Sequence, residues 1–296
     1  MTDAGKAASR RLVLAVTTFN RRDYLRECLA SWAATRNPAH RWMLIVADDG
    51  SADGTLDDLM RPAFGVDCHV IRNQRRSVGG QTNTIFDACR RMPFDVGFKI
   101  DDDIVFKKRG WDDLYLKAMA ASGFQHLCQL NVKLWNSERR PKVPLLPERP
   151  LAIDPSGSCV AYTDVYNCMG CFFTFTPAML AAVGDVDEAS FPIRGDWHID
   201  YSARLCRAGF NRVETFFDAR GSNDYIDIQN NLKSVYKRSL ALQGPEMAAT
   251  SNPAEAERRR KIVHDETRLF VQRDAKAPRA SASTTPLSDL KSGSAR

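Results

Sequence analysis

Short apolar runs alternate with stretches of helical periodicity from the start of this chain to Phe106, and this alternation restricts the fold more than any other feature. The apolar runs cover residues 11–19, 42–51, 68–73 and 95–106. In each intervening stretch, apolar side chains recur at helical spacing or follow a polar turn that opens a helix. Strands that alternate with helices in this way predict an α/β fold with a mostly parallel sheet and helices on both of its faces.

Polar side chains follow each predicted strand at the point where it ends. These polar segments are residues 17–20, 48–51, 72–76 and 101–103. In parallel α/β sheets, ligands bind beyond the carboxyl ends of the strands. We therefore expect the four segments to contribute to one shared site.

The rest of the chain predicts a second half and a polar tail. A loop rich in Pro, Arg and Ser spans 135–158, aromatic strands are expected over 162–176, and a helix follows a polar entry at 195–210. The predicted division is a disordered start (1–10), a single domain (11–240), a helical extension (241–272) and a disordered tail (273–296). Within the domain, a first half (11–106) is followed by a second half (107–240).

The composition narrows the classes of partner. The net charge of +6 over 296 residues suits a phosphate-bearing ligand or an anionic membrane surface. No dense Lys/Arg stripe interleaved with aromatic residues is present, which disfavours nucleic acid. No apolar run reaches the roughly 20 residues of a membrane span, and the first residues lack a signal-peptide pattern. We expect a cytoplasmic protein that can contact the inner face of a membrane peripherally; its oligomeric state is open.

Eight cysteines favour reduced, buried thiols, because the start of the chain carries no export signal. Cys168 and Cys171 form one CxxC pair, but a zinc site normally requires a second pair or histidines at matching spacing. Zinc is therefore disfavoured, and we expect these two thiols to serve packing.

The triplet Asp101, Asp102 and Asp103 is the strongest candidate for chemistry. Three adjacent carboxylates repel one another unless a cation or hydrogen-bond donors compensate. Mn²⁺ or Mg²⁺ would do so, since both prefer oxygen ligands, and either would also neutralise a nucleotide diphosphate. The alternative is an ordinary solvated acidic turn.

The other strand ends carry candidate nucleotide ligands. A carboxylate at Asp48 or Asp49 can accept the imide N–H of uracil or a ribose hydroxyl, although Asp before Gly50 is also a common turn. Arg75 and Arg76 suit a diphosphate through their forked donors, and the nearby glycines permit close backbone approach. Each has the alternative role of an exposed loop or a helix cap.

Several segments taken together resemble family 2 glycosyltransferases, the inverting GT-A group. They are VTTFNR, VADDGSADGT, the N-x-x-R-x-x-G-G-x-x-N run that ends at Asn83, IDDD, MGCFFTFTPAMLAAVGDVDE and GDWHIDYSARLCRAGF. Their shared order covers residues 12–209. The resemblance implies a GT-A fold, a nucleotide-sugar donor and a metal ion.

Combined with the strand-end positions, the resemblance yields a predicted set of site residues. The predicted nucleotide ligands are Thr17, Phe19, Asn20, Arg22, Asp49, Arg76, Gly80, Asn83, Asp101 and Asp102, and the predicted metal ligands are Asp103 and Asp101. On the acceptor side we expect Gly170 to allow close approach of a sugar. Trp135 and Trp197 are candidates for stacking on a sugar ring, with a core or loop-anchor role as the alternative for both.

The catalytic base departs from the family pattern. Inverting transfer needs one carboxylate or imidazole to deprotonate the acceptor hydroxyl. The family usually supplies an Asp six residues before an Arg, but counting back from Arg204 leads to His198. Asp196 and Asp200 flank it, so all three are candidates, and the sequence analysis favours Asp200.

The residues and the resemblance together predict a metal-dependent inverting glycosyltransferase, with a UDP-sugar as the donor that the family suggests. Its acceptor would be a hydroxyl of a glycan such as a polysaccharide, a lipid-linked glycan or a protein. Within residues 11–240, the resemblance implies a nucleotide-binding half (11–106) and an acceptor half (107–240). A sugar-nucleotide pyrophosphorylase is disfavoured, since TTFNRRDYL lacks the glycines of a phosphate loop after the first strand. A catalytically weak nucleotide-sugar-binding or interaction protein stays open because of the unusual WHID segment.

Overall fold

The fold was obtained as a computed structural model. The structure describes residues 9–55, 65–131, 147, 149–191, 196–212, 215–229, 253–272 and 285–286. Most of the predicted loop 135–158, including Trp135, lies outside these residues, as does most of the polar segment 53–60, for which the sequence predicts a helix.

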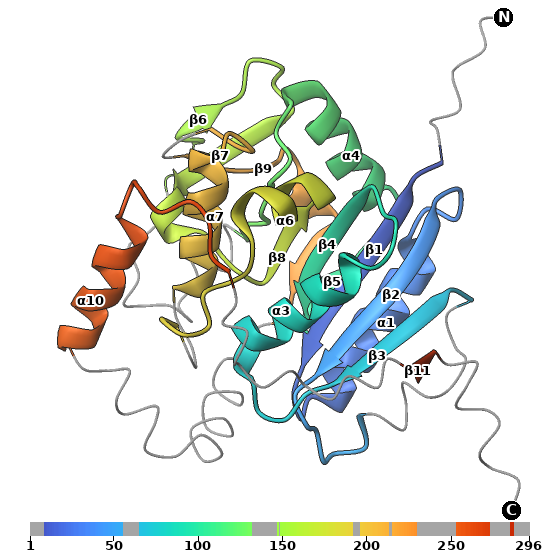
Figure 1. Cartoon of the computed structure of the whole chain (residues 1–296). Helices are drawn as coiled ribbons and strands as arrows, with labels where there is room; N and C mark the ends of the chain where they lie inside the picture. Colours follow the sequence, from blue (N-terminus) through green and yellow to red (C-terminus); the bar gives the residue numbers. More distant parts are fainter. Residues whose placement is uncertain are drawn as a thin grey trace, which may run out of the picture.

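A six-stranded sheet forms the centre of the molecule (Figure 1). Its order is β11-β3-β2-β1-β4-β8, and β1 to β4 run parallel, whereas β8 and β11 are antiparallel to their neighbours. The strands are β1 (Arg11–Thr18), β2 (Arg41–Asp48), β3 (Asp67–Arg72), β4 (Val96–Asp101), β8 (Phe172–Phe175) and β11 (Thr285–Pro286). The predicted mostly parallel α/β sheet is confirmed.

Helices cover both faces of this sheet, as the aromatic contacts show. On one face, α1 (Arg22–Thr35) and α4 (Trp111–Ser122) meet at Trp42 of β2, whose ring lies 5.6 Å from Trp32 and 5.7 Å from Trp111. On the other face, Phe86 of α3 (Ser77–Cys89) lies 5.3 Å from Phe175 of β8 and 5.4 Å from Tyr201 of α7 (Trp197–Arg207). Both faces of the sheet are therefore buried, which explains why its strands read as nearly continuous apolar runs.

The fourth predicted strand is shorter than expected. It was predicted to continue to Phe106, but β4 ends at Asp101, and a turn separates it from β5 (Ile104–Phe106). After this turn β5 leaves the main sheet and pairs with β10 (Ile226–Ile228). The break places the acidic triplet on a turn at the carboxyl end of the sheet.

The second half of the chain adds smaller elements around this sheet (Figure 1). A three-stranded antiparallel sheet contains β6 (Ala152–Ile153), β7 (Cys159–Asp164) and β9 (Thr215–Ala219). The remaining helices are α6 (Pro177–Val183), α10 (Pro253–Val263) and the 3-10 turns η1 (Val165–Asn167) and η2 (Ser222–Asp224). Among the described residues, no helix has the length and apolar character needed to cross a bilayer.

Candidate functional site

The ends of β1, β2 and β4 bring three of the predicted polar segments together. Thr17 is the register partner of Asp101, and Thr18 is the partner of Asp48. Thr17 Oγ1 donates to Asp101 Oδ1 at 3.1 Å, and Thr18 Oγ1 donates to Asp102 Oδ2 at 2.7 Å. The central strand β1 thus links the acidic triplet to the 48–51 turn at one edge of the sheet.

Cations from the chain itself hold the acidic triplet. Arg21 forms ion pairs with Asp102 at 2.6 Å and with Asp103 at 3.0 Å, so that its guanidinium bridges the two carboxylates. Lys99, whose side chain is fully buried, lies 2.5 Å from Asp101. Burial raises the pKa of Asp102 to about 7, although Arg21 opposes this shift. The mutual repulsion of the triplet is therefore offset by two basic side chains.

The triplet suits a cation that takes its remaining ligands from a substrate, because it does not supply a complete set of metal ligands by itself. Within the described ranges, no group of three or more His, Cys, Asp or Glu side chains is arranged to hold a metal. Mg²⁺, however, is usually held by one or two carboxylates together with substrate phosphates. The side chain of Asp101 is 32% exposed and that of Asp103 16%, whereas Asp102 is 3% exposed. Asp101 and Asp103 are therefore the members that a ligand can reach.

Asp49 holds the start of α3. Its two carboxylate oxygens accept the backbone N–H groups of Arg76 at 2.6 Å and Ser77 at 3.1 Å. Burial raises the pKa of Asp49 to about 6, against the opposing effect of these hydrogen bonds. Asp49 thus fixes the turn that carries the arginines, and this turn lies next to the end of β1, where the Arg75 guanidinium is 4.6 Å from the ring of Phe19.

Several buried polar atoms around these strand ends have no protein partner. Within the described part of the chain, Asp48 Oδ1, Asn73 Oδ1, Arg76 Nη1 and Ser77 Oγ lack a hydrogen bond. Most buried polar groups in proteins are paired, so a group of unpaired ones calls for an explanation. Arg75 and Ser77 also adopt positive φ angles of 54° and 68°, a strained conformation that is common at ligand sites. The turn from β3 into α3 therefore retains unused polar groups that a ligand can satisfy.

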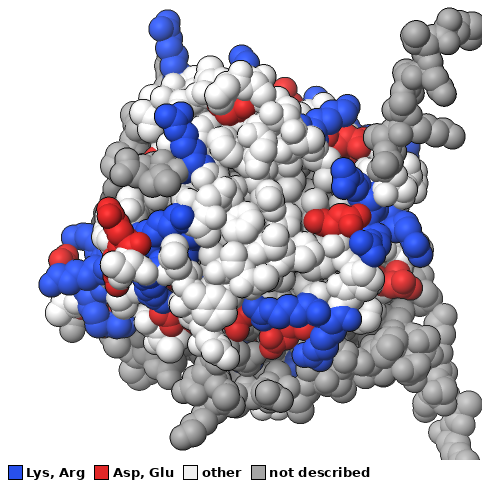
Figure 2. Space-filling view, turned by 45° about the horizontal axis from the view of Figure 1, so that its top comes forward, with Lys and Arg blue, Asp and Glu red and all other residues white. Residues whose placement is uncertain are grey.

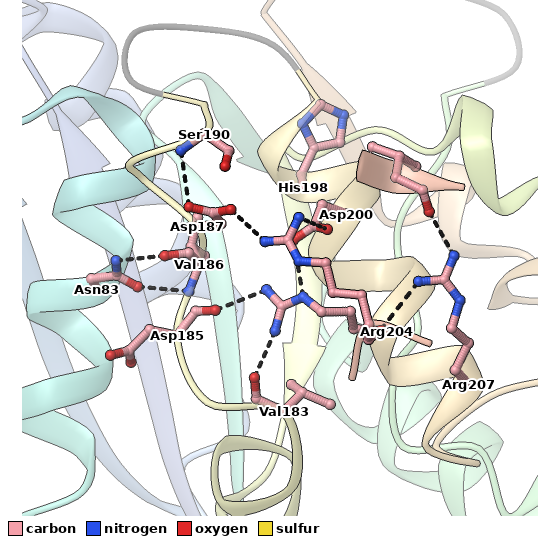
Figure 3. Close-up of polar contacts among 12 residues, drawn as sticks. Asn83, Val183, Asp185, Val186, Asp187, Ser190, His198, Asp200, Arg204 and Arg207 are labelled. Atoms are coloured by element: carbon pink, nitrogen blue, oxygen red, sulfur yellow. Dashed lines mark hydrogen bonds and ion pairs between the residues drawn. The ribbon is translucent and has the colours of Figure 1, made fainter. Parts of the chain in front are cut away.

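Other predicted nucleotide ligands make structural contacts. Asn83 is fully buried, and its side chain bonds the backbone of Val186 twice, donating to the carbonyl at 2.9 Å and accepting from the N–H at 2.8 Å (Figure 3). Gly80 packs under Glu188 and Arg76, where a Cβ would lie 2.7 Å from a Glu188 carboxylate oxygen.

The remaining two candidates lie at the turn after β1. Asn20 has a φ of 49° and bonds the turn after β2, with its N–H donating to Ser51 Oγ at 2.8 Å. Arg22 opens α1, and its backbone N–H donates to Asp53 at 3.0 Å. Both residues therefore hold the β1 end against the 50–55 segment.

The acceptor-side candidates lie at the start of α7. His198 Nε2 is 3.1 Å from the Cys168 carbonyl, which can only accept, so Nε2 carries the proton and Nδ1 is the basic nitrogen. Burial lowers the pKa of His198, with Asp196 partly offsetting this. A Cβ on Gly170 would lie 2.6 Å from His198 Cγ, so only glycine leaves room for this ring. Trp197 is buried and faces the Lys99 ammonium at 5.3 Å.

Asp200 is placed differently from the other two base candidates. It is fully buried, 2.9 Å from Arg204 and 3.2 Å from Arg268, inside a network of ion pairs (Figure 3). Asp196 is half-buried at the N-cap of α7, and its side chain makes no capping bond. In Figure 3, the His198 ring points away from the Asp200 network.

Three basic partners of the predicted acids were not predicted from the sequence: Arg21, Lys99 and Arg268. Lys99 was detectable, because residues two apart on a strand share a face and Lys99 precedes Asp101 by two. Arg21 is the arginine of the VTTFNR segment, but the adjacent Arg22 was predicted as a ligand instead. Arg268 lies 68 residues beyond Asp200, and no local pattern indicates that pairing.

A comparison of sequences decides the family. The profile described as "Glycosyl transferase family 2" matches residues 13–181, more than half of the chain. The chain belongs to glycosyl transferase family 2. This family membership, the glycosyltransferase activity and the GT-A type of fold are as the resemblance implied.

One curated relative matches most of this family 2 glycosyltransferase. It is "Uncharacterized glycosyltransferase R363" of Acanthamoeba polyphaga mimivirus, 24% identical over 226 residues, which cover 73% of this chain and 80% of the relative.

Solved structures with a similar fold are more distant. Staphylococcus aureus TarS 1–349 in complex with UDP is 13% identical with a TM-score of 0.47, and the match covers 70% of this chain and 60% of TarS 1–349. The mannosyltransferase PcManGT from Pyrobaculum calidifontis, in complex with GDP-Man and Mn²⁺, is 15% identical with a TM-score of 0.46, covering 70% and 55%. The transferase thus spans a little over half the length of these solved chains.

Proposed function

We propose that this glycosyltransferase moves a sugar from a UDP-sugar, with inversion and with the help of Mn²⁺ or Mg²⁺, to an acceptor hydroxyl. The acceptor belongs to a glycan, a lipid-linked glycan or a protein. The observation that supports this most directly is the junction of β1, β2 and β4, where the acidic triplet adjoins buried, unpaired polar groups.

The nucleotide would bind along the ends of β1, β2 and β3. Phe19 and Arg75 offer a stacked surface there, and Asp48 and Asn73 each have one buried oxygen available to accept a hydrogen bond. The unpaired Arg76 Nη1 is a donor suited to a phosphate oxygen. Asp49 fixes the start of α3 beside this proposed site, so we assign it a positioning role in addition to the predicted contact with the base.

Asp103 and Asp101 would hold the metal ion together with the diphosphate of the donor. When bound, such an ion would polarise the diphosphate oxygens and lower the charge on the departing nucleotide. Arg21 and Lys99 keep both carboxylates ordered and partly neutralised before the donor arrives.

His198 is the base that the geometry favours. The acceptor hydroxyl would give its proton to His198 Nδ1 as its oxygen bonds to the anomeric carbon, and the nucleoside diphosphate would leave from the opposite face with the bonding electrons. The lowered pKa of His198 keeps the imidazole neutral near pH 7, the form that accepts a proton. The full burial and ion pairs of Asp200 make it a poor base, and Asp196 would support the charged imidazolium.

The division of labour between the two halves follows from this placement. Residues 11–106 would bind the nucleotide, and residues 107–240 would bind the acceptor, with the loop at 135–158 selecting it.

The test is release of nucleoside diphosphate from UDP-glucose, UDP-N-acetylglucosamine and GDP-mannose, with and without Mn²⁺. We expect metal-dependent release of UDP that Asp103→Asn abolishes. Asp95→Asn is the matched control, because Asp95 precedes the opposite end of β4 and pairs with exposed Arg11. Equal release by wild type and Asp103→Asn would refute the assigned metal site.

A further inference from the structure

Residues 253–272, which we name the C-terminal strap, lie against the helix that carries His198. The strap consists of α10 and the extended segment after it (Figure 1). Arg207 of α7 donates to the Val263 carbonyl at 2.6 Å, and the His264 ring stacks on Tyr166 at 4.0 Å. The strap is thus in contact with α7 and with the turn that precedes Cys168.

The end of the strap pairs its backbone with the segment that leads toward α7. Val271 N–H donates to the Val183 carbonyl at 3.1 Å, and Asp185 N–H donates to the Val271 carbonyl at 2.8 Å. Gly184 lies between these two bonds, and a Cβ at this position would lie 2.1 Å from Val271 O. The 183–185 segment is therefore shaped to receive the strap backbone.

Arg268 connects this segment to α7 through two carboxylates. Its guanidinium contacts Asp187, and it lies 3.2 Å from Asp200 Oδ1. The other Asp200 oxygen is held by Arg204 at 2.9 Å, and Arg204 also donates to the carbonyls of Val183 and Asp185. The side chain of Arg268 is 17% exposed, so this bridge is largely shielded from water.

The Arg258–Glu255 and Arg260–Glu257 pairs of α10 do not take part in the bridge that Arg268 forms. Arg260 pairs with Glu257 and Arg258 with Glu255 on the exposed side of the helix. Figure 2 shows basic side chains gathered at the edge of the molecule where α10 lies, with acidic ones among them. Arg260 and Arg258 are thus paired within α10, whereas Arg268 forms an ion pair with Asp200 of α7.

We propose that Arg268 is a positioning residue that fixes the first turn of α7, and with it His198, from the C-terminal strap. Asp200 is two residues from His198 on that turn, and Arg268 and Arg204 hold its carboxylate from two directions. This inference rests on the proposed role of His198 as the base. It also gives the buried Asp200 a structural role, in which its carboxylate anchors the first turn of α7.

The first experiment is amide hydrogen exchange of the full chain. We compare wild type with Arg268→Met, Arg268→Lys and Val271→Pro, which removes the N–H that bonds Val183. Exchange at 197–203 should rise about tenfold or more in Arg268→Met and Val271→Pro, while α3 stays within about twofold of wild type. Arg268→Lys should fall between, and Arg260→Met, which alters an exposed pair on the same helix, should match wild type. Unchanged exchange at 197–203, or an equal rise in every element in both disruptive variants, would overturn the proposal.

The second experiment separates this proposal from the proposed function. In Arg268→Met we expect kcat for UDP release from UDP-glucose with Mn²⁺ to fall about tenfold, with Kd for UDP within about twofold of wild type. Arg268→Lys should recover part of the rate. A wild-type protein that neither binds UDP nor cleaves UDP-glucose would refute the proposed function, and hydrogen exchange would then decide the role of the strap. A kcat equal to that of wild type in Arg268→Met would refute the positioning role of Arg268.

Discussion

Each member of the acidic triplet is paired with a basic side chain of the protein, and the proposed base His198 is paired with a backbone carbonyl. Arg21 bridges Asp102 and Asp103, and Lys99 holds Asp101 from inside the sheet. At the start of α7, the Cys168 carbonyl fixes the His198 tautomer. Each reactive group is thus held in a defined orientation before any substrate binds, which limits the reorganisation needed during catalysis.

The proposed role of His198 as the base predicts part of the pH dependence of the reaction. Only its neutral form accepts a proton, and burial lowers its pKa, so the loss of kcat that its protonation causes should be confined to pH values below about 6.5. His198→Ala should lower kcat by about 10²–10⁴ and remove this acidic limb. Steady-state UDP release measured from pH 4.5 to 8.5 checks both outcomes. An acidic limb that persists unchanged in His198→Ala would show that another group is the base.

At the level of elements, α3 joins the proposed nucleotide site to the segment that follows α6. Its N-terminus is capped by Asp49, and its middle is bonded through Asn83 to the segment after α6. The two functions are separable, because the N-terminus faces the proposed ligand whereas Asn83 is buried behind it.

A pair of asparagine variants tests this separation. Asn83→Ala leaves a buried N–H and carbonyl of Val186 without partners, which should cost about 2–4 kcal/mol of unfolding free energy. The affinity of the folded variant for UDP should stay near the wild-type value. Asn73→Ala removes an unpaired oxygen at the proposed site, together with one hydrogen bond to Thr84, and should weaken UDP binding at least as much as it lowers stability. Urea unfolding and calorimetric titration with UDP measure both; loss of UDP affinity in folded Asn83→Ala alone would contradict this assignment.

The elements that the sequence predicted well are those with a strong local period. The strands β1 and β2 and the helices α1 and α3 lie where their apolar spacing indicated, because both faces of the sheet are buried. The break after Asp101 was not predictable from hydropathy, since Ile104 and Phe106 continue the apolar run. It depends on Arg21 and Thr18, about 80 residues earlier, which bind Asp102 within the turn. The fit of Arg268 to Asp200 is equally non-local.

Across the whole molecule, buried polar groups join elements that lie far apart in the chain, as Asp218 does within the second half. Asp218 of β9 accepts hydrogen bonds from Tyr115 of α4 at 2.7 Å and from Ser222 of η2. Burial raises the pKa of Asp218 to about 7. The folded chain therefore keeps a proton on this group at a pH where the unfolded chain, with a pKa of about 3.9, has lost it.

This difference makes stability depend on pH in a defined direction. Because the folded state binds more protons between about pH 4 and 7, the free energy of unfolding falls as pH rises through that range. Asp218→Asn should reduce the loss between pH 5 and pH 8 by about 2–3 kcal/mol. Urea unfolding of both proteins at the two pH values gives the comparison. An equal pH dependence in the two proteins would show that Asp218 ionises normally in the folded state.

We propose above all that a nucleotide diphosphate and a divalent cation bind together at the ends of β1, β2 and β4. The most direct measurement is the anomalous diffraction of Mn²⁺ in crystals grown with UDP and Mn²⁺. We predict one strong peak beside Asp103 and Asp101, with the UDP base between Phe19 and the Asp48–Asn73 edge. A peak remote from the acidic triplet, or UDP bound away from the carboxyl ends of these strands, would show that the donor and the metal bind elsewhere.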